Sequence, residues 1–96
     1  MDMLLIISNP ASEQVALGLA AAATRSKVTW GAFFTNDGVK VLGNEEFATA
    51  VSSAESAVAC QDSWEHHMAG QTCPVELGSQ TNNSLAVSNA KRVVSL

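Results

Sequence analysis

Residues 3–34, MLLIISNPASEQVALGLAAAATRSKVTWGAFF, contain the strand-helix-strand pattern that decides the fold. Residues 3–8 form an unbroken apolar run, which is typical of a strand covered on both faces. Asn9 can cap a following helix, and Pro10 suits the first helical position. Residues 28–34 are rich in β-branched and aromatic side chains and predict a second strand. The stretch therefore predicts one β-α-β unit.

The helix between these two strands is rich in alanine. Val15, Leu19 and Ala22 recur at helical spacing. Arg25 and Lys27 at its end complement the negative pole of the helix macrodipole. The many alanines indicate close packing against a sheet or against another subunit.

The same pattern of strand and helix continues after residue 34. Residues 35–38, TNDG, predict a turn in which Gly38 can take a positive φ without a Cβ penalty, and residues 39–42 predict a brief extension of the strand. Asn44 then caps a helix with two glutamates, Glu45 and Glu46, in its first turn. The buried face of this helix is expected to consist of Phe47, Ala48 and Val51.

The remaining elements are expected in this order: a strand at 57–60, a helix at 63–68, a strand at 75–77, a helix at 81–89 and a strand at 92–96. Asp62 or Ser63 caps the first of these helices in this prediction, and Gly70 ends it. Strands that alternate with helices predict one domain, residues 1–96, with an α/β fold. We expect three layers, α/β/α, around a mainly parallel sheet of about five strands.

Length and composition exclude several functional classes. Ninety-six residues can bury one core but no large internal pocket. The net charge is -4 and the five cationic residues are scattered, so no basic stripe is present for nucleic acid. No stretch approaches the roughly 20 apolar residues of a membrane span, and the apolar start lacks a basic signal-peptide region. We therefore expect a cytoplasmic protein with neither nucleic acid nor membrane as a partner.

The reactive side chains are concentrated in residues 60–73, CQDSWEHHMAGQTC, which hold both cysteines and both histidines. Cys60 ends a predicted strand, at the sheet edge where parallel sheets place ligands and reactive groups. A helix that starts there would favour the thiolate and lower the pKa of Cys60. Such a thiolate can attack an electrophile or accept sulfur. The alternative is that Cys60 is a small buried strand residue.

The roles of the other three reactive side chains stay open at this point. His66 and His67 point about 100° apart on a helix, so one of them at most is expected to face Cys60, as a base or hydrogen-bond partner. The other histidine is expected in solvent or at a subunit contact. Cys73 comes just before a predicted strand and is interpreted either as a buried side chain or as a resolving thiol for Cys60.

No metal or organic cofactor is expected. A zinc site made of Cys60, Cys73 and one histidine lacks a fourth ligand, and the spacing of these residues is not that of a zinc knuckle. The first predicted strand is not followed by a glycine-rich phosphate loop. The chain also has no serine elbow and no pair of carboxylates at a useful spacing.

Four stretches, taken in order along the chain, carry a resemblance to a known family. Residues 33–39, FFTNDGV, contain an aromatic strand followed by a D-G-V turn, and residues 58–63, VACQDS, contain a strand end with a C-x-x-S pattern. Residues 74–84, PVELGSQTNNS, and residues 88–96, SNAKRVVSL, fall at the fourth strand, the last helix and the closing strand. In this order they resemble the DsrE/DsrF-like family of small sulfur-relay proteins, which includes the TusD-type subunits.

The resemblance implies a three-layer α/β fold, assembly into homo- or hetero-oligomers, and a cysteine that carries sulfur as a persulfide. That cysteine corresponds to Cys60, and the partners would be thiol-bearing sulfur donor and acceptor proteins. Ser63 and one of His66 or His67 could stabilise the thiolate or the persulfide. The leading hypothesis is thus a cytoplasmic sulfur-transfer protein, which the resemblance leads us to expect as a homo-oligomer. The alternatives are a non-catalytic scaffold subunit of a sulfur-relay or regulatory complex and a metal-binding protein.

Overall fold

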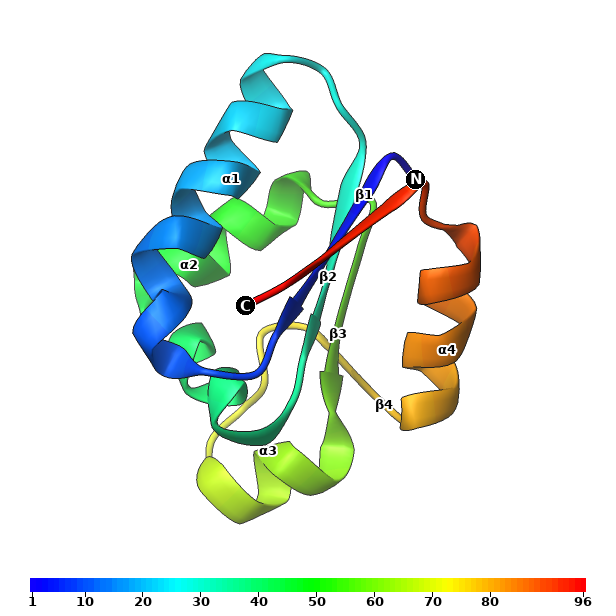
Figure 1. Cartoon of the computed structure of the whole chain (residues 1–96). Coiled ribbons are helices and arrows are strands. Elements are labelled where there is room, and N and C mark those ends of the chain that lie inside the picture. Colours follow the sequence, from blue (N-terminus) through cyan, green and yellow to red (C-terminus); the bar gives the residue numbers. More distant parts are fainter.

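The computed structural model describes all residues, 1–96, and has a five-stranded parallel sheet between two helical layers (Figure 1). The strands are β1 (Met3–Ile7), β2 (Trp30–Phe34), β3 (Ser56–Cys60), β4 (Glu76–Gly78) and β5 (Arg92–Ser95). The α-helices are α1 (Glu13–Arg25), α2 (Glu45–Ala50), α3 (Gln61–His67) and α4 (Gln80–Asn89). Three 3-10 helices are η1 (Pro10–Ser12), η2 (Asn36–Gly43) and η3 (Val51–Ser53). The predicted three-layer α/β fold is confirmed. No helix combines the length and the apolar character needed to cross a bilayer.

The strand order is β4-β3-β2-β1-β5, and every neighbouring pair is parallel. The chain moves from β1 to β4 in one direction, and α4 then returns across the sheet to place β5 on the other side of β1. Helices α1 and α2 cover one face, and α4 covers the other (Figure 1). The chain therefore leaves the neighbouring strands β3 and β4 toward opposite faces. In open parallel sheets such a divergence leaves a crevice at the carboxyl ends of the two strands.

The main core lies between the sheet and the layer formed by α1, α2 and η2. Strand β2 is buried along its whole length. Phe34 of β2 meets Phe47 of α2 edge to face, with ring centroids 5.7 Å apart, a favourable geometry for two aromatic rings. Trp64 of α3 packs into the same cluster. This core fixes β2 and β3, and with them the position of Cys60 at the end of β3.

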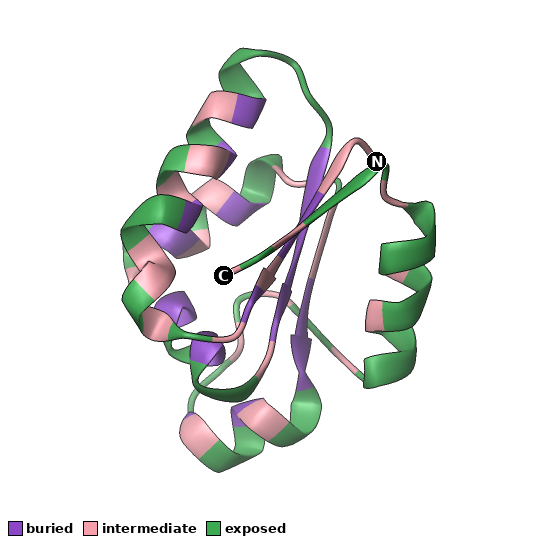
Figure 2. Ribbon diagram, viewed as in Figure 1, coloured by how far each residue is buried: buried purple, intermediate pink, exposed green.

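The opposite face of the sheet is covered more thinly. Its buried cluster consists of three residues, Phe33, Val58 and Cys60. Helix α4 has no buried residue, as Figure 2 shows, and its Leu85 is 59% exposed. One helix of this kind cannot shield five strands, so the two faces of the sheet differ in how strongly they are held.

The buried face of α1 differs from the pattern of Val15, Leu19 and Ala22 in the sequence. Three alanines face the core instead: Ala16, Ala20 and Ala23. Val15 is 57% exposed. Alanine brings the helix close to the sheet, and its methyl group fills the narrow gap that remains, so the larger side chains fall beside the contact line. The predicted close packing of the alanines is present, but with a different set of residues.

The prediction for residues 36–42 was wrong in its details. The segment forms the 3-10 helix η2 instead of a turn and a strand extension, and the positive φ, 52°, belongs to Asn36. Gly38 is required for a different reason: a Cβ there would overlap the carbonyl oxygen of Ile7 and lie 2.6 Å from its carbonyl carbon. The close approach of η2 to the end of β1 therefore accounts for this glycine.

The predicted helix caps have a mixed outcome. Asn44 caps α2 through its Oδ1, which accepts the N–H of Glu46 at 2.9 Å, as predicted. Asn9 accepts the N–H of Ala11 at 2.9 Å, but it caps η1, which precedes α1. Helix α3 begins directly after Cys60, two residues earlier than expected, so neither Asp62 nor Ser63 occupies its cap position.

Candidate functional site

The crevice predicted by the topology is present as a hollow of about 300 Å³ at the carboxyl ends of β3 and β4. Around Cys60 it is lined by Gln61, Asp62, Gly78, Ser79, Gln80 and Asn82. Cys60 is the register partner of Gly78. A Cβ at Gly78 would lie 2.6 Å from Oδ1 of Asn82 and 2.7 Å from Cγ1 of Val58, so any larger residue would force these side chains to shift. The missing side chain leaves space beside the Cys60 sulfur.

Ser63, in the first turn of α3, is brought to Cys60 as the sequence predicted. Its oxygen accepts the backbone N–H of Asn36 at 2.8 Å. With that interaction in place, the hydroxyl proton is free to be donated to the Cys60 sulfur. Asn36 makes this contact with a left-handed backbone, a conformation that asparagine tolerates better than most residues. Two segments far apart in the sequence thus orient one hydroxyl group.

Gln80, the first residue of α4, is a site residue that sequence reasoning missed. Its side-chain amide is a donor to Cys60, and its Nε2 lies 3.4 Å from Oγ1 of Thr35. The start of α4 is held by Asn82, whose Oδ1 accepts the N–H of Ser79 at 2.7 Å. Gln80 follows the end of β4, at the same sheet edge as Cys60. That position after a predicted strand was the signal that could have identified it.

The electrostatics of the hollow favour the thiolate. Burial by itself raises the pKa of the Cys60 thiol, because the residue is only 7% exposed. Hydrogen bonds from the Ser63 hydroxyl, the backbone of Ser63 and Asp62, and the Gln80 side chain act in the opposite direction. Together the donors outweigh the burial, and the pKa of Cys60 lies below the ordinary value of 9.0. Donors that stabilise the anion in this way raise the reactive fraction at neutral pH.

The two histidines lie at the other end of α3, about 10 Å from Cys60 along the helix axis. His67 contacts Asp37 at the start of η2, with its Nε2 3.0 Å from Oδ1 of Asp37. His66 packs its ring edge to face against His67, with centroids 4.6 Å apart. Neither histidine is among the groups that donate to Cys60. In this structure the pair joins α3 to η2.

Cys73 has a different environment from Cys60. It is partly buried against the main core, whereas Cys60 belongs to the small cluster on the other face of the sheet. Burial raises the pKa of the Cys73 thiol, and the N–H of Val75 offsets only part of that effect. Both cysteines are free thiols. The structure does not bring the two together as a bonded pair.

No group of three or more histidine, cysteine or acidic side chains is arranged to hold a metal ion. The Cys-His-His-Cys segment is divided among the crevice, the contact with η2 and the main core.

The chain matches no family model, no curated protein and no solved structure. Its description therefore rests on its own fold and site. It is a three-layer α/β/α protein with a cysteine in a crevice lined by hydrogen-bond donors.

Proposed function

We propose that this chain is a sulfur-transfer protein in which the Cys60 thiolate accepts a sulfane sulfur as a persulfide and passes it to a second thiol. The observation that carries the proposal is the set of donors that lower the pKa of Cys60 beside an open hollow. Ser63 and Gln80 supply the side-chain donors. The resemblance of four ordered stretches to the DsrE/DsrF-like sulfur-relay proteins points to the same chemistry.

The reaction is an exchange at sulfur. The Cys60 thiolate attacks the outer sulfur of a donor persulfide, RS–SH, so that a new S–S bond forms at Cys60 and the S–S bond of the donor breaks. The electron pair of the broken bond leaves with the donor as its thiolate. An acceptor thiolate then attacks the outer sulfur on Cys60 and regenerates the Cys60 thiolate. The hydrogen bonds from Ser63 and Gln80 assist both steps, because they lower the pKa of Cys60. A lower pKa raises the thiolate fraction in the first step and makes Cys60 a better leaving group in the second.

The partners proposed for this exchange are sulfur donor and acceptor proteins that carry a reactive thiol. The hollow of about 300 Å³ has room for a terminal thiol or persulfide, and Asp62 is the one charged side chain among its lining residues. We also propose a cytoplasmic setting, where thiols stay reduced, and assembly of several copies of the chain. No organic cofactor takes part in this mechanism.

A non-catalytic binding or scaffold subunit is the second candidate. The observation that favours it is the burial of Cys60, which packs with Phe33 and Val58 and is only 7% exposed. In this case Cys60 would stabilise the α4 face of the sheet and take no part in chemistry.

Intact-mass measurement after treatment with glutathione persulfide separates the two functions. We expect the wild-type protein and Cys73→Ser to gain the mass of one sulfur atom, and Cys60→Ser to gain none. A second measurement, alkylation of Cys60 by iodoacetamide, shows whether the thiol is accessible at all. Equal sulfur uptake by Cys60→Ser contradicts the carrier role of Cys60. A wild-type protein that is alkylated at Cys60 but takes up no sulfur favours the scaffold function.

A further inference from the structure

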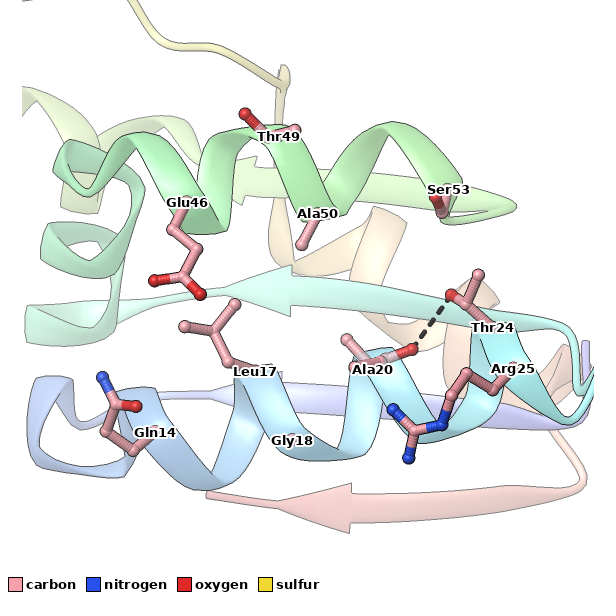
Figure 3. Close-up of a pocket in the computed structure, with 11 residues that line it drawn as sticks. Gln14, Leu17, Gly18, Ala20, Thr24, Arg25, Glu46, Thr49, Ala50 and Ser53 are labelled. Carbon is pink, nitrogen blue, oxygen red and sulfur yellow. Dashed lines mark hydrogen bonds between the residues drawn. The ribbon is translucent and has the colours of Figure 1, made fainter.

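The outer surface of the helical layer carries a groove of about 650 Å³ between α1 and α2 (Figure 3). Small side chains form most of its lining, and Leu17 is its one large aliphatic residue. Figure 3 shows the carboxylate of Glu46 at one end and the guanidinium group of Arg25 toward the other. None of the lining residues also lines the Cys60 hollow. The groove is therefore a separate feature of the molecule.

Between its two ends, α1 has no charged residue at an exposed position. The exposed positions between the two ends of the helix are Gln14, Val15, Gly18, Ala21 and Thr24. A helix face in contact with solvent normally carries charged residues. The hydroxyl of Thr24 is also turned inward. It donates to the carbonyl oxygen of Ala20 at 3.0 Å (Figure 3) and accepts the indole N–H of Trp30 at 3.2 Å. This face resembles the contact surface of a helix pair more than a solvated surface.

Gly18 lies at the middle of that face and has no role within the single chain. Its φ is not positive, and no atom lies within 4 Å of the place where a Cβ would stand. Glycine in a helix interior destabilises the helix relative to alanine. Gly18 therefore weakens α1, and no contact within the single chain explains why glycine stands there. A second helix that approaches α1 closely would supply that cause, because small residues at a contact let two helix backbones come near each other.

We propose that a second copy of this chain occupies the groove, with its α1 packed antiparallel to the first α1 across a two-fold axis. Gln14, Gly18, Ala21 and Arg25 follow one another at spacings of four, three and four residues, the spacing of a helix-helix seam. This order is the same from either end, as an isologous contact requires. An axis between Gly18 and Ala21 places each glycine against the partner's Ala21.

The charges at the ends of the groove agree with this arrangement. The two-fold axis carries Arg25 to the end of the groove where the partner subunit's Gln14 and the partner subunit's Glu46 lie. The same contact forms a second time by symmetry. Each copy therefore presents both members of an ion pair, and the two helices are held in register at both ends. A contact made mainly by one pair of 13-residue helices is small, so we expect a dissociation constant in the micromolar range.

Sedimentation equilibrium over roughly 1 µM to 1 mM protein tests the proposal. We expect the wild-type protein to pass from monomer to dimer across this range. Gly18→Leu should remain monomeric, because its side chain would separate the helices, while open space around Gly18 allows the single chain to fold normally. Circular dichroism of Gly18→Leu checks that the fold is kept.

A charge exchange makes the test specific for the proposed register. Arg25→Glu should weaken the dimer at least tenfold, and the double variant Arg25→Glu/Glu46→Arg should restore most of the affinity by reversing both ion pairs. Lys40→Glu is the matched control, because it makes the same change of charge at an exposed residue outside the groove. A wild-type protein that stays monomeric overturns the proposal. A dimer affinity that Gly18→Leu leaves unchanged also overturns it, as does a double variant whose dimer affinity is no higher than that of Arg25→Glu. The sulfur-transfer proposal is tested at Cys60 and stands or falls independently of these results.

Discussion

The hydroxyl of Ser63 is shared between two neighbours, because it accepts from Asn36 and donates to Cys60. We expect Ser63→Ala to raise the pKa of Cys60, since the thiolate then loses a donor. Because the folded protein lowers this pKa, the variant should be alkylated several-fold more slowly at neutral pH, and its rate profile should move to higher pH. The measurement is the pH dependence of iodoacetamide alkylation in a Cys73→Ser background.

Two further variants show whether the effect comes from hydrogen bonding. Ser63→Thr keeps the hydroxyl and should keep the profile near that of the parent. Gln80→Leu removes the second side-chain donor and should also move the profile to higher pH. A profile that is the same in Ser63→Ala and in the parent protein would show that the donors do not set the pKa of Cys60.

Two glycines of this chain respond oppositely to the same small change. Gly38→Ala places a methyl group against the backbone of Ile7, so we expect the free energy of unfolding to fall by about 3 kcal/mol. Gly18→Ala adds the methyl group in open space and should raise the free energy of unfolding of the monomer by about 0.5–1 kcal/mol. Urea denaturation at low protein concentration measures both. Equal unfolding midpoints for the two variants would contradict the close approach of η2 to β1.

Among the elements, α2 depends on a single side chain at its start. The Oδ1 of Asn44 accepts the N–H of Glu46, and the chain offers no other side-chain partner for that group. We expect Asn44→Ala to lower the free energy of unfolding by about 1 kcal/mol, the usual effect of losing such a cap. Asn44→Ser should keep most of the stability. If thermal denaturation finds Asn44→Ala as stable as Asn44→Ser, the cap does not contribute.

The elements that the sequence predicts well are those with local causes. The apolar run at 3–8 and the cap at Asn44 contain all the information that their elements need. Residues 36–43 lack such a local cause. Their 3-10 helix is set by packing against the end of β1 and against α3, and Gly38 shows its role only when Ile7 stands beside it.

In the candidate site, too, some residues can be predicted from a local segment and others only from the topology. Cys60 and Ser63 belong to one local segment and were predicted together. Gln80 reaches the sulfur only because β4 pairs with β3 and α4 starts at the same sheet edge, which is a property of the topology. The histidines share the local segment with Cys60, but a helix of seven residues carries them to its far end, where Asp37 is the contact of His67.

At the scale of the whole molecule, the two faces of the sheet should open at different free energies. Helix α4 has no buried residue, and Val93 of β5 is 42% exposed, whereas β2 is buried throughout. We expect amide hydrogens of residues 80–96 to exchange through a partial opening, and those of residues 30–34 only through global unfolding. Hydrogen exchange followed by mass spectrometry measures this difference. Equal protection of the two regions would mean that the thin layer opens only together with the rest of the fold.

The position of Gln80 on this weakly held helix has a consequence for the sulfur transfer proposed above. If α4 moved away, the hollow would widen, but Gln80 would leave with the helix and the Cys60 thiolate would lose one of its hydrogen-bond donors. With α4 in place, the thiolate keeps all of its donors, but the approach to it is narrowest. Access to Cys60 and the nucleophilicity of its thiolate would therefore change in opposite directions as α4 moves. In the sulfur transfer proposed above, a partner that entered while α4 stayed in place would therefore meet the thiolate in its most reactive form.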